Sequence, residues 1–229
     1  MPVLGLVGGM SWHASALYYR RINKEAERRY GSGATVETVL FTLRFADLLA
    51  AGQAGNWDEV NRQIVTAARR CADAGADLVM ITAFTGHSAA KALEEQLPLP
   101  LVHAGDAFAD AVSADQTVGL LGTQFMLDAG VIKARLQERG LRVVQADAPP
   151  ANRLDDAILG DLTQGNMSPS ARGALEDAIN DVVDHGADKV LLACTELPLL
   201  IANGPADDLL VDGVTAHINA ALNRMETLQ

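Results

Sequence analysis

The sequence predicts an α/β protein built from two similar lobes, each a parallel sheet flanked by helices. Three observations support this prediction: apolar runs alternate with longer amphipathic stretches, the composition suits close packing, and one sequence pattern occurs twice. The 229 residues are 49% hydrophobic but only 4% aromatic, which is typical of small and aliphatic side chains packed between helices and a parallel sheet.

Short apolar runs bounded by turn residues are expected to form strands. They are Val3–Val7, Val36–Leu43, Leu78–Thr82, Leu99–Val102, Val118–Leu121, Leu141–Val144, Val190–Ala193 and Leu209–Val211. Between them, stretches with helical periodicity are expected to form helices. These include Ala14–Arg29, Trp57–Ala74, Asp128–Arg139, Pro169–Asp184 and Thr215–Met225.

Several helix ends carry recognisable signals. Asn56 with Glu59 has the pattern of a capping box, and Ser168, followed by a proline, has the pattern of an N-cap. Gly75 and Gly186 occupy the place of the glycine that ends a helix. These signals favour helices that start and stop between the expected strands, as parallel pairing requires.

The repeat divides the chain into two halves. Three pairs of segments match in the same order at nearly the same offset, which favours two related lobes over chance. The pairs are Gly75–Ala83 with Gly186–Cys194, Gly5–Gly9 with Gly119–Thr123, and Leu101–His103 with Leu210–Asp212. We therefore predict an N-terminal lobe over residues 1–103, a C-terminal lobe over 104–208, and a last strand and helix over 209–229 that can pack back on the first lobe.

Ligands of open α/β sheets gather beyond the carboxyl ends of the strands. The segments that follow the matched strands are Gly8–Ser11, Ala83–His87, Gly122–Met126 and Cys194–Glu196. If the two lobes face each other, these segments converge, so the sequence predicts an active site in a cleft between the lobes.

The net charge of −11 repels phosphate backbones and makes nucleic acid a poor partner, so an acid-binding site must supply its own donors. We expect no membrane association, because no apolar run reaches the length of a bilayer span and no signal peptide is recognisable. Two cysteines, Cys71 and Cys194, cannot form a disulfide framework, and a cytoplasmic location is expected.

Cys194 is the leading candidate for chemistry. It ends an apolar run, and the N-terminus of a following helix is expected to lower the pKa of its thiol. Position alone equally allows a buried cysteine that packs as a small hydrophobe. Cys71 lies at helical spacing from Ile64 and Ala67, so we expect it to pack in the core.

Longer motifs carry a family resemblance. Gly5-Leu6-Val7-Gly8-Gly9-Met10-Ser11-Trp12, with Tyr18-Tyr19-Arg20 and Ile22-Asn23, resembles the start of the broad-specificity amino-acid racemases of the aspartate/glutamate racemase family. Leu120-Leu121-Gly122-Thr123, Cys194-Thr195-Glu196 and Thr85-Gly86-His87 resemble other signatures of that family. The resemblance runs over essentially the whole chain.

The resemblance implies a mechanism in which one thiolate removes the α-proton of an amino acid and a thiol on the other face returns one. It implies no cofactor: neither pyridoxal phosphate nor a metal is needed. It also implies a homodimer. The partner expected from it is a small carboxylate or amino-acid substrate.

Four positions depart from the family pattern. Ala83 stands where the family carries its first cysteine or a threonine, and Phe84 where asparagine is usual. His13 replaces a glutamate, and Met126 stands where a hydroxyl residue is common. Because Ala83 has no titratable atom, racemisation by two side-chain thiols is excluded at these positions.

The resulting candidates fall into three groups. Cys194 is the catalytic residue, and His13 or His87 is a possible second acid/base group. His87 can instead orient a loop by hydrogen bonding, His13 can be a solvated residue at the entrance, and His103 can hydrogen-bond within the wall of the cleft. Met10, Ser11, Arg44, Phe84, Thr85, Thr123 and Thr195 are candidate substrate-binding residues. The threonines can equally cap helices, Arg44 can be a surface residue, and Glu196 can be a cap or supporting group. His185 and His217 are expected on helix surfaces.

Three functions remain open from the sequence. The first is a cofactor-independent amino-acid racemase or isomerase, atypical or one-directional, that uses Cys194 with water or histidine opposite. The second is a lyase resembling arylmalonate decarboxylases, which keep only the second cysteine. The third is a non-catalytic acid-binding protein.

Overall fold

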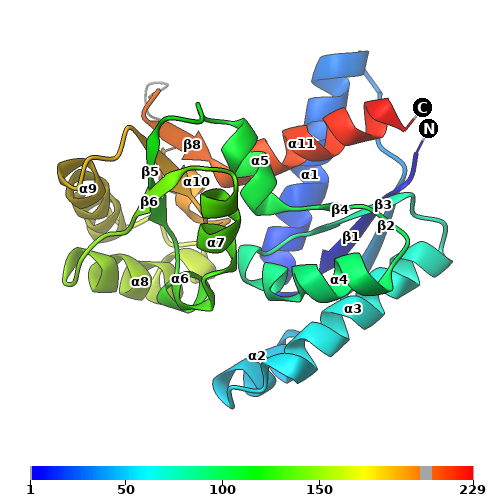
Figure 1. Ribbon diagram of the computed structural model, residues 1–229, viewed down its shortest axis with the longest axis horizontal. Helices are drawn as coiled ribbons and strands as arrows, with labels where there is room; N and C mark the ends of the chain where they lie inside the picture. The colour runs from blue at the N-terminus through cyan, green and yellow to red at the C-terminus, as the bar shows by residue number, and fades with distance from the viewer. Residues whose placement is uncertain (1, 202–207, 229) are drawn as a thin grey trace. The chain divides into compact units, whose positions relative to one another are not determined.

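A computed structural model of the chain describes residues 2–201 and 208–228. The chain divides into two compact units, Met1–His103 with His217–Gln229 and Ala104–Ala216. Each unit has its own four-stranded sheet in which all paired strands are parallel, with helices around it (Figure 1). The predicted fold class is therefore confirmed.

The sheet of the first unit has the order β2-β1-β3-β4. Its strands are β1 (Leu4–Gly8), β2 (Thr38–Thr42), β3 (Leu78–Ile81) and β4 (Leu101–Val102). Its helices are α1 (Trp12–Tyr30), α2 (Phe45–Gln53), α3 (Trp57–Asp73), the 3₁₀ helix η1 (Phe84–Ala89), α4 (Ala90–Gln96), and α11 (Gly213–Thr227) from His217 onward.

The helix α3 covers one face of this sheet. Its side chains Ile64, Ala68 and Cys71 pack with Val7 and Val79 in one buried cluster. Cys71 is fully buried, which confirms its predicted packing role. Helices α3 and α4 lie on one side of the sheet, and α1 and α11 lie on the other (Figure 1).

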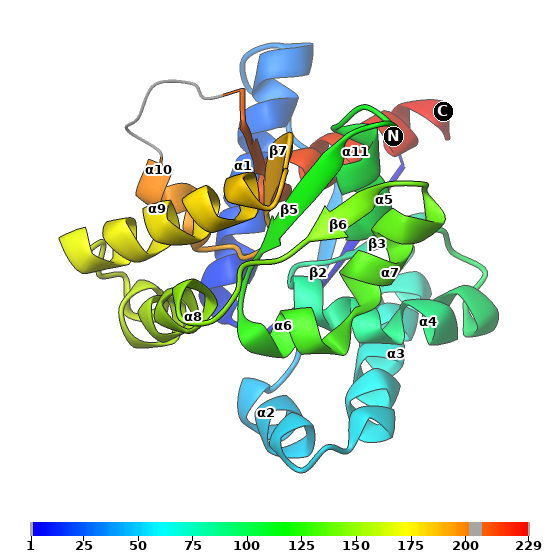
Figure 2. The same cartoon turned by 60° about the vertical axis from the view of Figure 1, so that its left-hand side comes forward.

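The second sheet has the order β6-β5-β7-β8, and Figure 2 shows its strands β6, β5 and β7 side by side. Its strands are β5 (Thr117–Leu121), β6 (Arg142–Val144), β7 (Lys189–Leu192) and β8 (Leu210–Asp212). Its helices are α5 (Ala104–Asp110), α6 (Gln124–Ala129), α7 (Val131–Glu138), α8 (Pro150–Gly160), η2 (Leu162–Gln164), α9 (Pro169–Asp184) and α10 (Leu197–Ile201). The apolar stripe of α9 packs Leu175 and Val182 with Val190 and Leu192 of the sheet.

The repeat found in the sequence is visible in the structure. Both sheets place their first strand second in the order, and the strand that carries the matched segment beside it. The local contacts repeat as well: the Asp77 carboxylate accepts from Val3 N at 2.7 Å, and the Asp188 carboxylate accepts from Thr117 N at 2.7 Å. Gly75 and Gly186 both have a φ near +90°, as predicted for glycines that end helices.

Two predicted boundaries differ from the structure. The single helix expected over residues 128–139 is two helices, because Gly130 has a left-handed conformation with φ +68° and separates α6 from α7. Residues 209–229 are predicted to form a last strand and helix that can pack back on the first lobe. In the structure β8 pairs with β7 in the second sheet, and the division between the units falls within α11, after Ala216.

The predicted caps differ in detail. Ser168 accepts from Ala171 N at 3.0 Å, which confirms the N-cap of α9. Asn56 accepts from Glu59 N at 3.2 Å. The carboxylate of Glu59 binds Arg62 and Gln63 instead, so the reciprocal half of the capping box is replaced by an ion pair within the helix.

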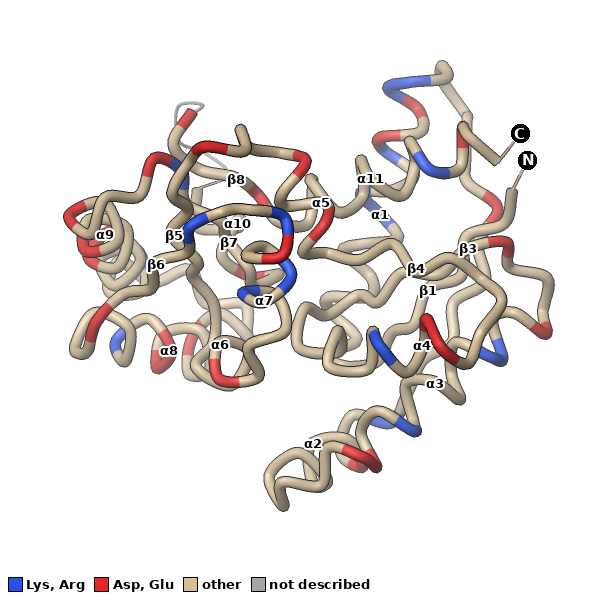
Figure 3. Tube along the Cα trace, viewed as in Figure 1, with Lys and Arg blue, Asp and Glu red and all other residues tan. Residues whose placement is uncertain are grey.

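Charged residues are spread over the helices of both units, with acidic positions throughout (Figure 3). Among the residues that the structure describes, no helix has the length and apolar content needed to cross a bilayer.

Candidate functional site

The predicted site segments follow the carboxyl ends of the strands in each unit. In the first unit, Gly8 ends β1 and Gly9–Ser11 follows it, Ala83–His87 follows β3, and His103 follows β4. In the second unit, Gly122–Met126 follows β5 and Cys194–Glu196 follows β7. Because parallel strands end at the same edge of a sheet, each set gathers at one edge of its own unit.

Cys194 lies two residues beyond β7 and is buried, with 8% of its surface exposed. Its Sγ donates to Oε2 of Glu196 at 3.2 Å. The hydroxyl of Thr195, which is also buried, donates to the same carboxylate oxygen. A thiol, a hydroxyl and a carboxylate on three consecutive residues thus form one hydrogen-bonded group at the sheet edge.

The pKa of the Cys194 thiol is raised well above its usual value, chiefly by burial and then by the negative charge of Glu196. The backbone N–H groups of Glu196 and Leu197 act in the opposite direction. The predicted lowering of this pKa by a helix N-terminus is therefore wrong. Helix α10 has only five residues, and its N–H groups do not outweigh desolvation of the thiolate. Cys194 is a neutral thiol at neutral pH.

Thr123 and Met126 belong to the turn after β5. Thr123 caps α6, because its Oγ1 accepts from Met126 N at 3.3 Å. Met126 is buried, and a Cβ on Gly122 would meet its Cε at 2.5 Å. The missing side chain at Gly122 is what lets the methionine pack against this turn.

The turn after β1 in the first unit is strained. Gly9 has φ +93°, and a Cβ there would lie 2.3 Å from the carbonyl oxygen of Leu43. Ser11 has φ +116°, which is rare for a residue with a side chain. Ser15 holds the turn by accepting from Gly9 N at 3.0 Å and donating to the Ser11 carbonyl or to Thr82. Backbone strain of this kind clusters at functional sites, which supports Met10 and Ser11 as site residues.

Ala83 and Phe84 begin the turn after β3. Ala83 is half-buried, Phe84 is buried, and Thr85 is half-buried within η1. A Cβ on Gly86 would lie 2.8 Å from the Cε of Met10, so the turns after β1 and β3 are in contact. The structure thus brings Met10 next to the Ala83–His87 segment.

His87 supports this turn from inside. Its side chain is fully buried, and Nδ1 lies 3.3 Å from the carbonyl of Ala83 and 3.2 Å from that of Phe84. Carbonyls only accept, so Nδ1 carries the proton. Burial, with the neighbouring His103 and His217, holds the pKa of His87 well below its usual range. A neutral, buried imidazole that orients a turn is a poor acid/base group, and the structure does not favour that role.

His217 is also fully buried, so its predicted place on a helix surface is wrong. Its Nε2 donates to the Val102 carbonyl at 2.8 Å, and its Nδ1 accepts from Tyr18 Oη at 3.0 Å. Burial lowers its pKa to about 4. The sequence held a signal for this: His217 lies three residues after Val214 and four before Ala221, on the apolar face of the helix.

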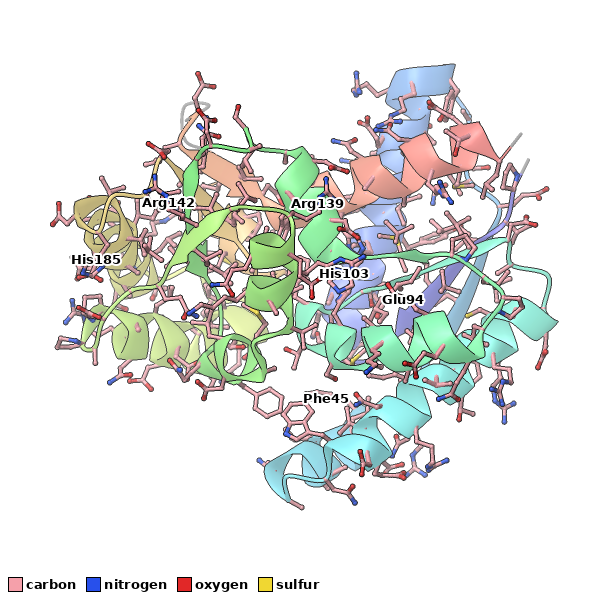
Figure 4. The ribbon with its side chains drawn as sticks, viewed as in Figure 1. Phe45, Glu94, His103, Arg139, Arg142 and His185 are labelled. Atoms are coloured by element: carbon pink, nitrogen blue, oxygen red, sulfur yellow. The ribbon has the colours of Figure 1, made fainter. Side chains whose placement is uncertain are left out.

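His103 completes the buried histidine cluster of the first unit. It is 4% exposed, and its ring centroid lies 4.9 Å from that of His87, which is 5.4 Å from that of His217. Figure 4 shows His103 at the end of β4.

Two predicted site residues are exposed. His13 stacks on Trp12 with ring centroids 3.7 Å apart. The side chain of Arg44 is 86% exposed and lies 3.5 Å from Asp47. The structure agrees better with Arg44 as a surface residue than as a binding group.

His185 is exposed, as predicted, at the end of α9 (Figure 4). It lies 3.5 Å from both Asp147 and Asp181. Within the described residues, this is the group whose ligand atoms come close enough for a metal ion. Its members are exposed or half-buried, and exposed acidic groups of this kind are common without a metal ion.

Comparison with known proteins agrees with the fold and the motifs. The profile of the Asp/Glu/Hydantoin racemase family matches residues 7–221. The chain belongs to this family. The family resemblance drawn from the sequence motifs is thereby confirmed.

Individual relatives agree with this assignment. A glutamate racemase of Deinococcus radiodurans is 33% identical over 114 residues, which are 47% of this chain and 37% of that protein. Among solved structures, a candidate Asp/Glu racemase from Yersinia pestis has a TM-score of 0.90 at 28% identity, with both chains fully covered. An aspartate racemase homologue from Pyrococcus horikoshii has a TM-score of 0.86 at 23% identity, covering 99% of this chain and 100% of that one. The latter likeness shows the shared fold.

Proposed function

We propose that this member of the Asp/Glu/Hydantoin racemase family is an isomerase that transfers a proton at the α-carbon of an amino acid or another small carboxylate. Cys194 is the proposed acid/base group, and no cofactor is proposed. The observation that carries the proposal is the position of Cys194 at the carboxyl edge of its sheet, where Sγ is held by a carboxylate 3.2 Å away. Family membership supports the racemase-type reaction.

The proposed binding groups come from the turns after β5 and β7. Thr123 offers its hydroxyl, and the backbone N–H groups of both turns can donate to a carboxylate or to a developing enolate. The hydroxyl of Thr195 already donates to Glu196, so it can only accept from a substrate. Ser11 and Thr85 remain predicted substrate-binding residues of the first unit. Arg44 is not proposed for binding.

Ala83 makes the reaction asymmetric. In the sequence repeat, Ala83 is the counterpart of Cys194, and its methyl group cannot exchange a proton. We therefore propose that solvent water supplies the second proton, which favours slow or one-directional racemisation.

A second candidate function is a decarboxylase-type lyase. The observation that favours it is the raised pKa of Cys194, because a neutral thiol is a proton donor. Loss of carbon dioxide generates a carbanion without a base, so one donor suffices to complete the reaction.

The two candidates separate in one experiment. The protein is dialysed against a chelator and incubated in D2O with amino acids of both hands and with arylmalonates, without pyridoxal phosphate, and followed by NMR. Deuterium entering the α-position of an amino acid supports the isomerase, whereas loss of carbon dioxide from a malonate supports the lyase. Cys194→Ser should lower either activity by about 10²–10⁴-fold.

Cys71→Ala is the matched control, since Cys71 lies in the core of the first unit and its removal should leave turnover per folded molecule unchanged. Turnover that persists in Cys194→Ser would reject the proposed role of the thiol. If the protein binds an acid but catalyses neither exchange nor decarboxylation, it is a non-catalytic binding protein.

A further inference from the structure

We propose that Glu196 is the proton acceptor of Cys194, so that the thiol and the carboxylate act as one acid/base pair. The inference rests on the proposed function, and it assigns to Glu196 a positioning and proton-holding role that acts through the sulfur. The sequence alone allowed Glu196 to be only a cap or a supporting group.

The geometry of the three residues supports this role. Sγ donates to Oε2 of Glu196 at 3.2 Å, and the hydroxyl of Thr195 donates to the same oxygen. The hydroxyl therefore turns one defined carboxylate oxygen toward the sulfur. All three side chains come from the short junction between β7 and α10, so their separation depends on a few backbone torsions rather than on distant packing.

The state of the thiol shows why an acceptor is needed. Burial keeps Cys194 protonated, and only a thiolate can take a proton from carbon. Within the described part of the chain, Glu196 is the ionisable side chain that hydrogen-bonds Sγ. A nucleophile or base that is weak at its own pKa is ordinarily activated by such an adjacent base.

The proton transfers balance as follows. The proton of the thiol moves to Oε2 and leaves a thiolate beside a neutral carboxylic acid. The thiolate takes the α-proton, which restores the thiol and leaves a carbanion. Water gives a proton to the other face of the carbanion, and the hydroxide formed takes the proton of Glu196, so the carboxylate and the thiol are both regenerated.

The contact between Sγ and the Glu196 carboxylate should affect the thiol pKa and proton transfer at carbon in opposite ways. A purely structural Glu196 would not have both effects. The charged carboxylate disfavours the thiolate next to it, which is part of why the pKa of Cys194 is raised. Once it has taken the proton, the same group is neutral and can donate to the thiolate. Removing the charge should therefore make the sulfur easier to ionise and, at the same time, slow proton transfer at carbon.

The test uses Glu196→Gln, which keeps the size of the side chain and removes both the charge and the basic oxygen. The pH dependence of alkylation by iodoacetamide reports the thiol pKa. Cys71 is fully buried, and the Cys194→Ala variant measures any alkylation that Cys71 contributes. The expected result is a lower pKa of Cys194 and faster alkylation near pH 8, together with α-deuterium exchange that is about 10²-fold slower or more.

Two further variants complete the test. Glu196→Asp keeps a carboxylate and should retain more exchange than Glu196→Gln. Glu176→Gln, on the exposed side of α9, makes the same change of charge outside the site and should alter neither the thiol pKa nor exchange.

Exchange that survives intact in Glu196→Gln would overturn the inference, even if the wild type is an active isomerase. The inference would also be overturned if Glu196→Gln left the thiol pKa unchanged and reduced exchange only in proportion to the loss of folded protein. A wild type that exchanges no substrate would overturn the proposed function and the inference together, and a pKa shift would then show the contact to be electrostatic only.

Discussion

The two units repeat one topology but differ in chemistry at equivalent places. The turn after β3 begins with Ala83 and Phe84, whereas the turn after β7 begins with Cys194 and Thr195. The turn after β3 is supported by the buried histidine cluster, whereas the turn after β7 carries a thiol hydrogen-bonded to a carboxylate. The two copies of one topology therefore carry different side chains at equivalent places.

The turns after the first strand of each sheet differ as well. Gly9 has φ +93°, but its counterpart Thr123 has φ −68° and caps a helix. The first turn is tight enough to press Gly9 against the Leu43 backbone and to force Ser11 into a strained conformation. The second turn is relaxed. The unit that lacks Cys194 is thus the one with the more constrained backbone at this turn.

The largest expected effect on stability comes from filling the strained turn. Gly9→Ala should destabilise the protein by about 3 kcal/mol or more, because a Cβ there combines an unfavourable φ with a 2.3 Å contact to the Leu43 carbonyl. Urea unfolding followed by circular dichroism measures the change. Gly173→Ala is the control: its Cβ would meet nothing within 4 Å in α9, so it should stabilise by about 0.5–1 kcal/mol. Equal stability of the two variants would contradict the strain.

Lowering the pH should destabilise the first unit more than the second. His217 has a pKa of about 4 when folded, below the usual 6.5, so the unfolded chain binds a proton more readily. Stability is lost as the pH falls from about 6.5 toward 4, by about 3 kcal/mol at most for this group. The lowered pKa of His87 acts in the same direction.

Tryptophan fluorescence reports on the first unit alone, because both tryptophans, Trp12 and Trp57, belong to it. On acidification the fluorescence should change at a higher pH than the circular dichroism of the whole chain. His217→Gln should bring the two transitions closer together. Coincident transitions in the wild type would show that the histidines do not set the acid stability of this unit.

The smallest effect tests whether the difference between the turns can be reversed. Ala83→Cys places a thiol at the counterpart of Cys194, and under the isomerase proposal it should raise racemisation by about tenfold to a hundredfold. Exchange at the α-carbon and polarimetry measure the gain for each enantiomer. Phe84→Ala is a control for changes of shape without a new titratable group. No gain from the cysteine would count against water as the limiting second donor.

Much of the fold was predictable because it depends on local patterns. Each strand in the described part of the chain lies within a few residues of the apolar run that predicted it, and Pro169–Asp184 is a helix with the predicted bounds. The helix break at Gly130 was missed because a glycine between two apolar stretches is also tolerated within one helix. The burial of His217 was missed because histidine is common on surfaces, although its spacing indicated the apolar face.

The candidate site was predictable in position and less so in electrostatics. The sequence placed Cys194 and its neighbours just after the end of a strand, and the structure confirms this location. The direction of the thiol pKa was predicted wrongly because the sequence shows a following helix but not the burial of the sulfur. His87 was recognisable as part of a segment that follows a strand, but its hydrogen bonds to the Ala83 and Phe84 carbonyls depend on a folded turn.

The sequence by itself determined the order of strands and helices, the repeat, the family, and the absence of a titratable side chain at Ala83. These properties follow from residue identity and short-range periodicity. Only the tertiary structure decided that Cys194 is a neutral thiol against Glu196, that three histidines share one buried cluster, and that the first turn is strained. Each of these depends on desolvation and on contacts between segments, and both arise when the sheets and helices pack.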